Sequence, residues 1–387
     1  MPRADKKVVH KYQRVLVRLE EDILSGKYKA GQKLPSEATL IRQFQTSRIT
    51  VGRAIRELGN KGLIDRRVGS GTYVRAEKTT GLLFGLLIPD LGETEIFEPI
   101  CQGMASARQA AAHALLWANV TTGSASKEEQ AWQLCRQYIS RDVSGVFFAA
   151  LEHTPESEKT NHRILAALES AEIPVVLLDR EVLPYPRRGK HDLIGIDNHR
   201  AGFMITEHLL GLGCRRIGFL TLPDPASTVA IRISGFREAL SVYCTPSEAG
   251  FVQRLDPSQE PAVRRMVESI RPDAIICSND RTAGILMHSL IALGYRIPAD
   301  IRIAGFDDVK YARLLPVPLT TIHQPCRNIG EAAMAAMLER ISRPDMPPRD
   351  ILLGCTLVVR DSCGAGLGVR QEIGGIGLGG VATNDPS

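Results

Sequence analysis

The sequence predicts an α/β protein with a small winged helix-turn-helix at its N-terminus and a larger part built on parallel sheets. Near the N-terminus, apolar residues recur at helical spacing and are followed by two short β-like runs around a glycine turn. Farther along, short apolar runs alternate with helical-period stretches. Continuous apolar strands that alternate with helices are typical of parallel α/β sheets.

Composition narrows the class of protein. The chain has 387 residues, of which 44% are hydrophobic, so two or three domains with sizeable cores are expected. No apolar run is long enough to cross a membrane, and the N-terminus lacks the apolar segment of a secretory signal, so a cytoplasmic protein is expected. The eight cysteines include no C-x-x-C pair, so we expect reduced thiols and neither a metal nor another cofactor.

Charge is distributed unevenly along the chain. Residues 1–80 carry 18 Lys and Arg against 8 Asp and Glu, whereas the remainder carries 30 against 35. A compact basic segment joined to a mildly acidic body suggests a module that binds a polyanion. The alternative from charge alone is a solvated basic face with no partner.

Three helices and a hairpin are expected in the first eighty residues. The apolar stripe of the first helix runs from Val8 to Leu24, and Ser36 can cap a short second helix. Ser47 can cap the third helix, "RITVGRAIRELGNKG", whose inner stripe leaves Arg48, Thr50 and Arg53 able to project outward. The N-terminal residues of such a third helix read base edges in the major groove of DNA.

The stretch "RRVGSGTYV", residues 66–74, could be read as a glycine-rich phosphate cradle or as the wing of a DNA-binding domain. A phosphate cradle needs a strand before its glycines and a helix after them, but here a strand follows a strand. We therefore expect a wing in which Gly69 and Gly71 allow a tight turn. Arg66 and Arg67 would then lie close to backbone phosphates, the alternative being a purely structural hairpin.

This segment closely resembles the DNA-binding domain of the gluconate-repressor (GntR) family, over roughly residues 11–75, through "LPSE", "SR-TV", "GLI" and "G-GT-V". The resemblance implies DNA contacts from Ser47, Arg48 and Thr50, with Gly69 entering at a minor-groove edge. The chain departs from the family pattern at Ala38 and at Gly52, where a basic residue is usual. Arg53, next to Gly52, points about 100° farther around the helix. DNA binding is expected, with a salt dependence flatter by roughly one unit of slope.

The acidic body alternates strands with helices. Polar residues end several of its strands, and ligands gather at the carboxyl ends of parallel strands. The expected strands are 82–88, 114–120, 145–151, 173–179, 216–222, 273–280 and 301–308, and the helices between them include 198–211, 229–241, 259–270 and 281–293.

The order of these elements resembles the effector domain of the lactose-repressor (LacI) family and its periplasmic sugar-binding relatives over about residues 82–362. The resemblance is carried by "IPVVLLDR", "GIDNHRAGFMITEHLLGLGCRRIGFL", "RISGFREAL", "AIICSNDRTAGILMHSLIALGYRIPADIRIAGFDD" and "LTTIHQP". It implies two periplasmic-binding-protein-like lobes joined by three crossovers, with a lobe break near 190–195 and a return at 320–325. A small molecule would be held between the lobes.

The resemblance also implies five ligand contacts, which are Asp179, Arg232, Asn279, Asp307 and Gln324. Carboxylates, a guanidinium and amides together suit a polyol. Glu152-His153-Thr154 and the loop 89–97 rank as weaker candidates. Asp280 and Asp308 are expected to cap the segments that follow them, and Arg232, Asn279 and Asp307 each have a structural alternative as a surface ion pair or turn former.

The expected domains are a winged helix at 8–75, a linker at 76–81, a two-lobed ligand-binding domain at 82–362 and a glycine-rich, disordered tail at 363–387. This pairing resembles arabinose-responsive repressors. The expected function is a homodimeric repressor that binds double-stranded operator DNA under control of a small ligand, most simply a monosaccharide, with no catalytic residue and no membrane partner. The alternatives are an enzyme acting on sugar phosphates with an accessory basic domain, and a non-catalytic sugar-binding protein.

Overall fold

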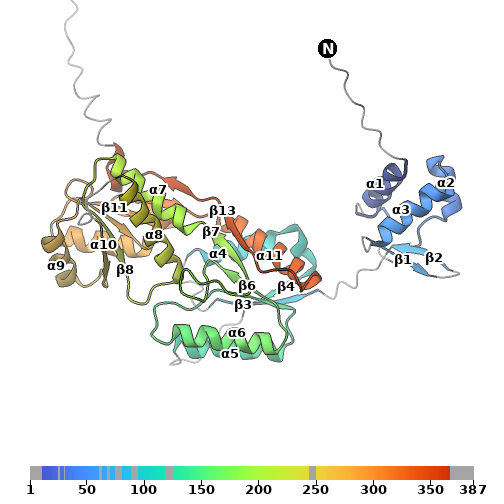
Figure 1. The fold of residues 1–387 in the computed structure, drawn as a ribbon, viewed down its shortest axis with the longest axis horizontal. Helices are drawn as coiled ribbons and strands as arrows, with labels where there is room; N and C mark the ends of the chain where they lie inside the picture. Colours follow the sequence, from blue (N-terminus) through green and yellow to red (C-terminus); the bar gives the residue numbers. More distant parts are fainter. Residues whose placement is uncertain are drawn as a thin grey trace, which may run out of the picture. The chain divides into compact units, whose positions relative to one another are not determined.

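The computed structural model describes residues 11–24, 27–29, 31–60, 63–67, 70–74, 81–88, 95–117, 126–243 and 250–366. The chain divides into two compact units, an N-terminal unit, Met1–Gly81, and a C-terminal unit, Leu82–Ser387 (Figure 1). Residues 76–80 of the expected linker (76–81) and residues 367–387 of the expected tail (363–387) lie outside the described residues. No helix among the described residues combines the length and the apolar character needed to cross a membrane.

The described residues of the N-terminal unit form three helices and a two-stranded antiparallel hairpin (Figure 1). Its buried centre is formed by the inner stripes of the helices, with Leu19, Leu40 and Leu58 fully buried. The elements are α1 (Lys11–Leu24), α2 (Glu37–Phe44), α3 (Arg48–Asn60), β1 (Ile64–Arg67) and β2 (Gly71–Val74).

Serine side chains begin α2 and α3. Oγ of Ser36 accepts a hydrogen bond of 3.2 Å from the backbone N–H of Thr39. Oγ of Ser47 accepts one of 3.3 Å from the backbone N–H of Thr50. Each bond satisfies a backbone donor that the first turn of a helix leaves without a partner. Both caps were predicted from the sequence and are confirmed.

The C-terminal unit is built on two six-stranded sheets, and each sheet forms the centre of one lobe. All strand pairs are parallel except that between β12 and β14. The first lobe has the order β13 (Asp350–Leu353), β7 (Asp192–Ile196), β6 (Val175–Leu178), β5 (Gly145–Phe148), β3 (Leu83–Leu87), β4 (Ala114–Leu116). The second has the order β14 (Thr356–Val358), β12 (Thr320–His323), β11 (Arg302–Asp307), β10 (Ala274–Cys277), β8 (Ile217–Thr221), β9 (Gly250–Arg254).

Helices cover the sheets of the C-terminal unit, and the α/β fold predicted from the sequence is confirmed. Two helix pairs pack especially closely, α4 with α11 and α7 with α8. Glycines allow this approach, because a Cβ on Gly103 or on Gly202 would lie 2.0 Å from a carbonyl oxygen of the partner helix. The helices are α4 (Phe97–Ser106), α5 (Lys127–Ser140), α6 (Ser157–Ser170), α7 (Asn198–Gly211), α8 (Ser227–Val242), α9 (Glu260–Ile270), α10 (Asp280–Ala292) and α11 (Cys326–Ser342).

Within the part of the chain that the structure describes, the backbone passes between the lobes three times. It leaves the first sheet after β7, returns from the second sheet between β12 and α11, and passes again between β13 and β14. The sequence placed the first passage near 190–195, but β7 occupies Asp192–Ile196 and pairs with β6 in the first sheet. The lobe boundary therefore falls after Ile196. One buried cluster includes apolar residues of both lobes, such as Phe147 and Phe306.

Candidate ligand cleft and nucleic-acid interface

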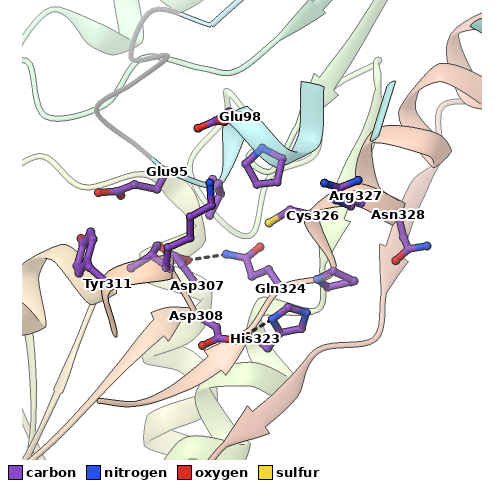
Figure 2. A pocket seen from close by; sticks show the side chains of 15 residues that line it. Glu95, Glu98, Asp307, Asp308, Tyr311, His323, Gln324, Cys326, Arg327 and Asn328 are labelled. Atoms are coloured by element: carbon purple, nitrogen blue, oxygen red, sulfur yellow. Dashed lines mark hydrogen bonds and ion pairs between the residues drawn. The ribbon is translucent and has the colours of Figure 1, made fainter. Parts of the chain in front are cut away.

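Two adjoining cavities lie where the strands of the two lobes end. The smaller has a volume of about 30 Å³ and the larger about 510 Å³, and Ile96 and Asp307 line both. The larger volume falls within the usual range for pockets that hold small molecules. Figure 2 shows the larger cavity, where Asp307, Gln324 and Tyr311 come from the second lobe and its return crossover. Asp179, Arg232 and Asn279 line the smaller cavity.

Arg232, on α8, is held rigidly at the smaller cavity. Its Nε donates a hydrogen bond of 2.8 Å to Oδ1 of Asn198, and its Nη1 donates one of 2.7 Å to the carbonyl oxygen of Ser278. The guanidinium also lies 4.5 Å from the ring centroid of Phe306. Only 4% of Arg232 is exposed. Its remaining nitrogen, Nη2, lies 3.9 Å from Oδ1 of Asp307.

Asp307 connects the two cavities. It is the last residue of β11, has a backbone φ of 110°, and lines both cavities. The side-chain amide of Gln324 donates a hydrogen bond of 2.7 Å to Asp307 Oδ1 (Figure 2). Burial raises the pKa of Asp307 to about 7, although Arg232 opposes the shift. Near neutral pH this carboxyl can therefore both donate and accept hydrogen bonds.

Two buried oxygens at the cavities accept no hydrogen bond from the described residues. They are Oδ1 of Asp179 and Oε1 of Gln324. Asp179 stands at the end of β6 with a φ of 67°, and burial raises its pKa against the effect of Arg180 and Arg232. Buried acceptors are normally satisfied, because leaving one without a partner costs on the order of 1–3 kcal/mol. Hydroxyl donors of a bound molecule would satisfy both oxygens.

On one side of the smaller cavity, the two lobes contact each other directly. The backbone N–H of His153 donates a hydrogen bond of 2.7 Å to the carbonyl oxygen of Asp224, and Ser227 Oγ donates one of 2.8 Å to that of Glu181. The backbone N–H of Ala226 donates to Glu152 Oε2 at 3.2 Å. These bonds join loops of the first lobe to the start of α8 in the second.

In the N-terminal unit, three of the predicted DNA contacts, Ser47, Arg48 and Thr50, lie at the start of α3. The hydroxyls of Ser47 and Thr50 lie 2.9 Å apart, so both belong to the helix cap. The side chain of Arg48 is 85% exposed, and its Nε lies 3.9 Å from Glu37 Oε2. Arg66, on β1, donates a hydrogen bond of 2.9 Å to the other oxygen of Glu37. Glu37 therefore links the start of the third helix to the wing.

Arg53 is directed differently. Its guanidinium lies 4.0 Å from the ring centroid of Tyr12, so it packs against α1. Gly52 faces open space, since no described atom lies within 4 Å of where its Cβ would be. The side chain of Arg67 and the whole of Gly69 lie outside the described residues.

Comparison with known families decides the class of both units. Residues 11–74 match the model of bacterial regulatory proteins of the gntR family, and residues 206–363 match that of a periplasmic binding protein-like domain. The chain joins a gntR-family regulatory domain to a periplasmic-binding-protein-like domain. Such a chain is a ligand-controlled, DNA-binding transcriptional regulator.

One relative is similar along most of the chain, and two solved structures are similar to about three quarters of it. The chain is 28% identical over 373 residues to the arabinose metabolism transcriptional repressor of Geobacillus stearothermophilus, an alignment that covers 92% of this chain and 98% of the relative. It is similar to the crystal structure of the transcription regulator GntR from Chromobacterium violaceum, with 29% identity and a TM-score of 0.55 over 73% of this chain and 99% of that one. A LacI-family regulator from Enterococcus faecium with bound ribose shares the fold, with 23% identity and a TM-score of 0.59 over 72% and 98% of the two chains.

The sequence assigned one pair of neighbours in the periplasmic-binding-protein-like domain incorrectly. Asp280 was expected to cap the following helix, but Asn279 does so, with its Oδ1 accepting a hydrogen bond of 2.8 Å from the backbone N–H of Thr282. Asp280 is fully buried and accepts bonds from Thr321 Oγ1 at 2.6 Å and the backbone N–H of Val309 at 3.1 Å. It therefore joins α10 to the last strands of the second sheet.

Asp308 was likewise expected to act as a cap, but its carboxylate lies in a hydrogen-bond contact of 3.0 Å with Nδ1 of His323 and forms an ion pair with Arg360. Sequence reasoning missed Arg180 and Asn198 and ranked Glu152 too low. Arg180 is 3% exposed and forms an ion pair with Glu152. Burial alone would raise the pKa of Glu152, but Arg180 and His153 lower it. Glu152 lies four residues after the end of β5 and Arg180 two residues after the end of β6, and this position after strands of the first lobe is the signal by which they could have been found.

Proposed function

We propose that this regulator represses transcription by binding double-stranded operator DNA through α3 and the β1–β2 wing. Three features support the proposal. Residues 1–80 carry an excess of basic residues, and the side chain of Arg48 is exposed at the start of α3. The hydrogen bond of 2.9 Å from Arg66 to Glu37 holds the wing next to Arg48. Ser47 and Thr50 would fix the helix start, while Arg66, Arg67 and Gly69 would meet the DNA backbone. Arg53 would contribute through its packing on Tyr12.

The proposed controlling ligand is a monosaccharide that occupies the interlobe cleft beside Asp307, the residue that lines both cavities. Asp307 and Gln324 line the larger cavity, while Asp179, Arg232 and Asn279 line the smaller one beside it. The single observation that carries this assignment is the pair of buried acceptors, Asp179 Oδ1 and Gln324 Oε1, which need hydroxyl donors. The relatives named for arabinose metabolism and solved with ribose agree with a sugar.

The mechanism follows from the two-lobed design. A ligand that binds the closed arrangement of the lobes more tightly shifts the population toward it, by no more than its differential affinity. One winged helix contacts few phosphates, so we propose a homodimer on two half-sites, in which lobe closure changes the spacing of the two DNA-binding units. The proposed domains are 8–75, 82–362, a linker at 76–81 and a tail at 363–387.

We also propose that the protein is located in the cytoplasm, catalyses no reaction and needs no cofactor. Its relatives are transcriptional regulators. Among the described residues, no group of three or more His, Cys, Asp or Glu side chains is placed to hold a metal ion. A turnover assay over a panel of sugar phosphates checks this part, and any genuine rate would favour the enzymatic alternative.

The direct test has two stages. A thermal-shift screen of monosaccharides against the full chain should identify a stabilising sugar, because a ligand that binds only the folded state raises its apparent stability. Band-shift titration with DNA from the protein's own upstream region should then show binding that this sugar weakens. Absence of binding to any duplex at low ionic strength would reject the proposal.

A further inference from the structure

Ile49, the second residue of α3, has an unusual environment. Its side chain is 84% exposed, the highest value among the large hydrophobic residues that the structure describes. The residue before it is the exposed Arg48, and the residue after it, Thr50, belongs to the helix cap. An apolar, β-branched side chain therefore projects into solvent at the centre of the surface proposed to meet DNA.

The neighbours of Ile49 on the helix surface leave this position open. Residues three and four positions ahead on a helix share its face, and here they are Gly52 and Arg53. Gly52 has no side chain and faces open space, and the guanidinium of Arg53 lies over the ring of Tyr12, 4.0 Å from its centroid. Ile49 and the bare backbone at Gly52 thus form a small apolar surface, which we call the Ile49–Gly52 face.

The hydroxyls that could otherwise read bases are engaged. Ser47 Oγ accepts from the backbone N–H of Thr50, and the two hydroxyls lie 2.9 Å apart. The cap holds both hydroxyls at the start of the helix beside the exposed Arg48, while the Ile49–Gly52 face offers apolar contacts. In the major groove, the apolar feature that distinguishes one base from the others is the 5-methyl group of thymine.

We infer that Ile49 determines specificity by packing against thymine methyl groups in the major groove, with Gly52 allowing the helix backbone to come close. This inference rests on the proposed function, since it requires α3 to enter the major groove. It predicts an operator with a thymine in each half-site next to the base that Arg48 reads. Burial of one methyl group between Ile49 and thymine corresponds to about a fourfold gain in the binding constant.

The test uses the full chain and deoxyuridine, which pairs like thymine but lacks its methyl group. Preferred duplexes are selected from a random pool, and each thymine is then replaced singly by uracil. For the wild-type protein, uracil at one or two positions per half-site should weaken binding about fourfold each. The Ile49→Ala protein should bind the thymine duplex more weakly than wild type by a similar, about fourfold factor. Its affinity should not change further when uracil replaces thymine at those same positions.

Matched variants control for folding and for position. Val17, 51% exposed on α1, provides the control, and Val17→Ala should keep the full uracil response. Ile49→Val, which removes one methyl and keeps the β-branch, should give an intermediate response with unchanged thermal unfolding. Equal uracil responses in wild type and Ile49→Ala overturn the inference, even when both proteins bind DNA. A uniform loss of affinity in Ile49→Ala relative to wild type, by the same factor for thymine and uracil duplexes, also overturns it and would indicate that Ile49 contacts a second DNA-binding unit instead of the bases. A selection that enriches no sequence overturns the proposed function as well.

Discussion

Gln324, at the return crossover between the lobes, donates a hydrogen bond of 2.7 Å from its side-chain amide to Oδ1 of Asp307 at the end of β11. The bond joins the crossover to the carboxylate that lines both cavities. Gln324 and Asp307 also line the same larger cavity, so the crossover contributes directly to the wall of the cleft.

The raised pKa of Asp307 predicts a pH dependence of stability. Burial shifts this pKa from 3.8 to about 7. Between these values the unfolded chain has released a proton that the folded chain still holds, so the free energy of unfolding should fall as the pH rises. Asp307→Asn should remove this part of the slope and stabilise the unliganded protein above pH 7. Denaturant unfolding of the C-terminal unit across this pH range measures it, and parallel profiles for both proteins would contradict the assignment.

Arg232 should be essential for the ligand response but not for DNA binding. Arg232→Lys keeps the charge but loses the fork that bonds Asn198 and Ser278, at a cost of roughly 1–3 kcal/mol in stability. We expect the sugar-induced thermal shift to disappear while the affinity for operator DNA stays within about twofold. Arg296→Lys, at an exposed ion pair with Asp300, is the matched control. A normal sugar response in Arg232→Lys would exclude Arg232 from the site.

Glu152 should stabilise the C-terminal unit through Arg180. Both side chains are largely buried, and removal of one partner leaves the other charge uncompensated. Glu152→Gln should lower the free energy of unfolding by about 3 kcal/mol. The exposed pair of Glu156 and Lys159 supplies the comparison, and Glu156→Gln should cost less than about 1 kcal/mol. Similar losses in the two variants, measured by denaturant unfolding, would argue against a buried ion pair.

Gly52 should limit the stability of the N-terminal unit. It lies inside α3 with open space at its Cβ position, so Ala can be placed there without a clash. Gly52→Ala should raise the free energy of unfolding of this unit by roughly 0.5–1 kcal/mol, because alanine loses less backbone entropy in a helix. Thermal unfolding of the full chain, followed at the transition of this unit, checks it. Destabilisation would mean that the position is crowded.

The sequence predicted much of this fold because local patterns determine its elements. Helix α7 occupies Asn198–Gly211, as expected, and the serine caps of α2 and α3 lie where their spacing to the apolar stripes put them. The lobe boundary was placed too early because the segment that forms β7 was not predicted as a strand. Only its pairing with β6 shows to which lobe it belongs.

The cleft was less predictable because its contacts depend on tertiary structure. Nothing local distinguishes Asn279 from Asp280, since both residue types cap helices and both follow the same strand. In the structure the two residues have different roles, because Asn279 caps α10 whereas Asp280 accepts a hydrogen bond from Thr321 of β12. The ion pair of Arg180 with Glu152 likewise joins the ends of two strands that lie apart in the sequence.

The central claim is that a ligand in the interlobe cleft controls DNA binding, and one measurement tests it most directly. The affinity of the full chain for its preferred duplex is measured by fluorescence anisotropy at fixed salt, with and without a saturating amount of the sugar found by thermal shift. The account predicts a weaker affinity in the presence of sugar, by about 5- to 150-fold, and no change for Arg232→Lys. Equal affinities of the wild-type protein with and without a sugar that demonstrably binds it would contradict the account.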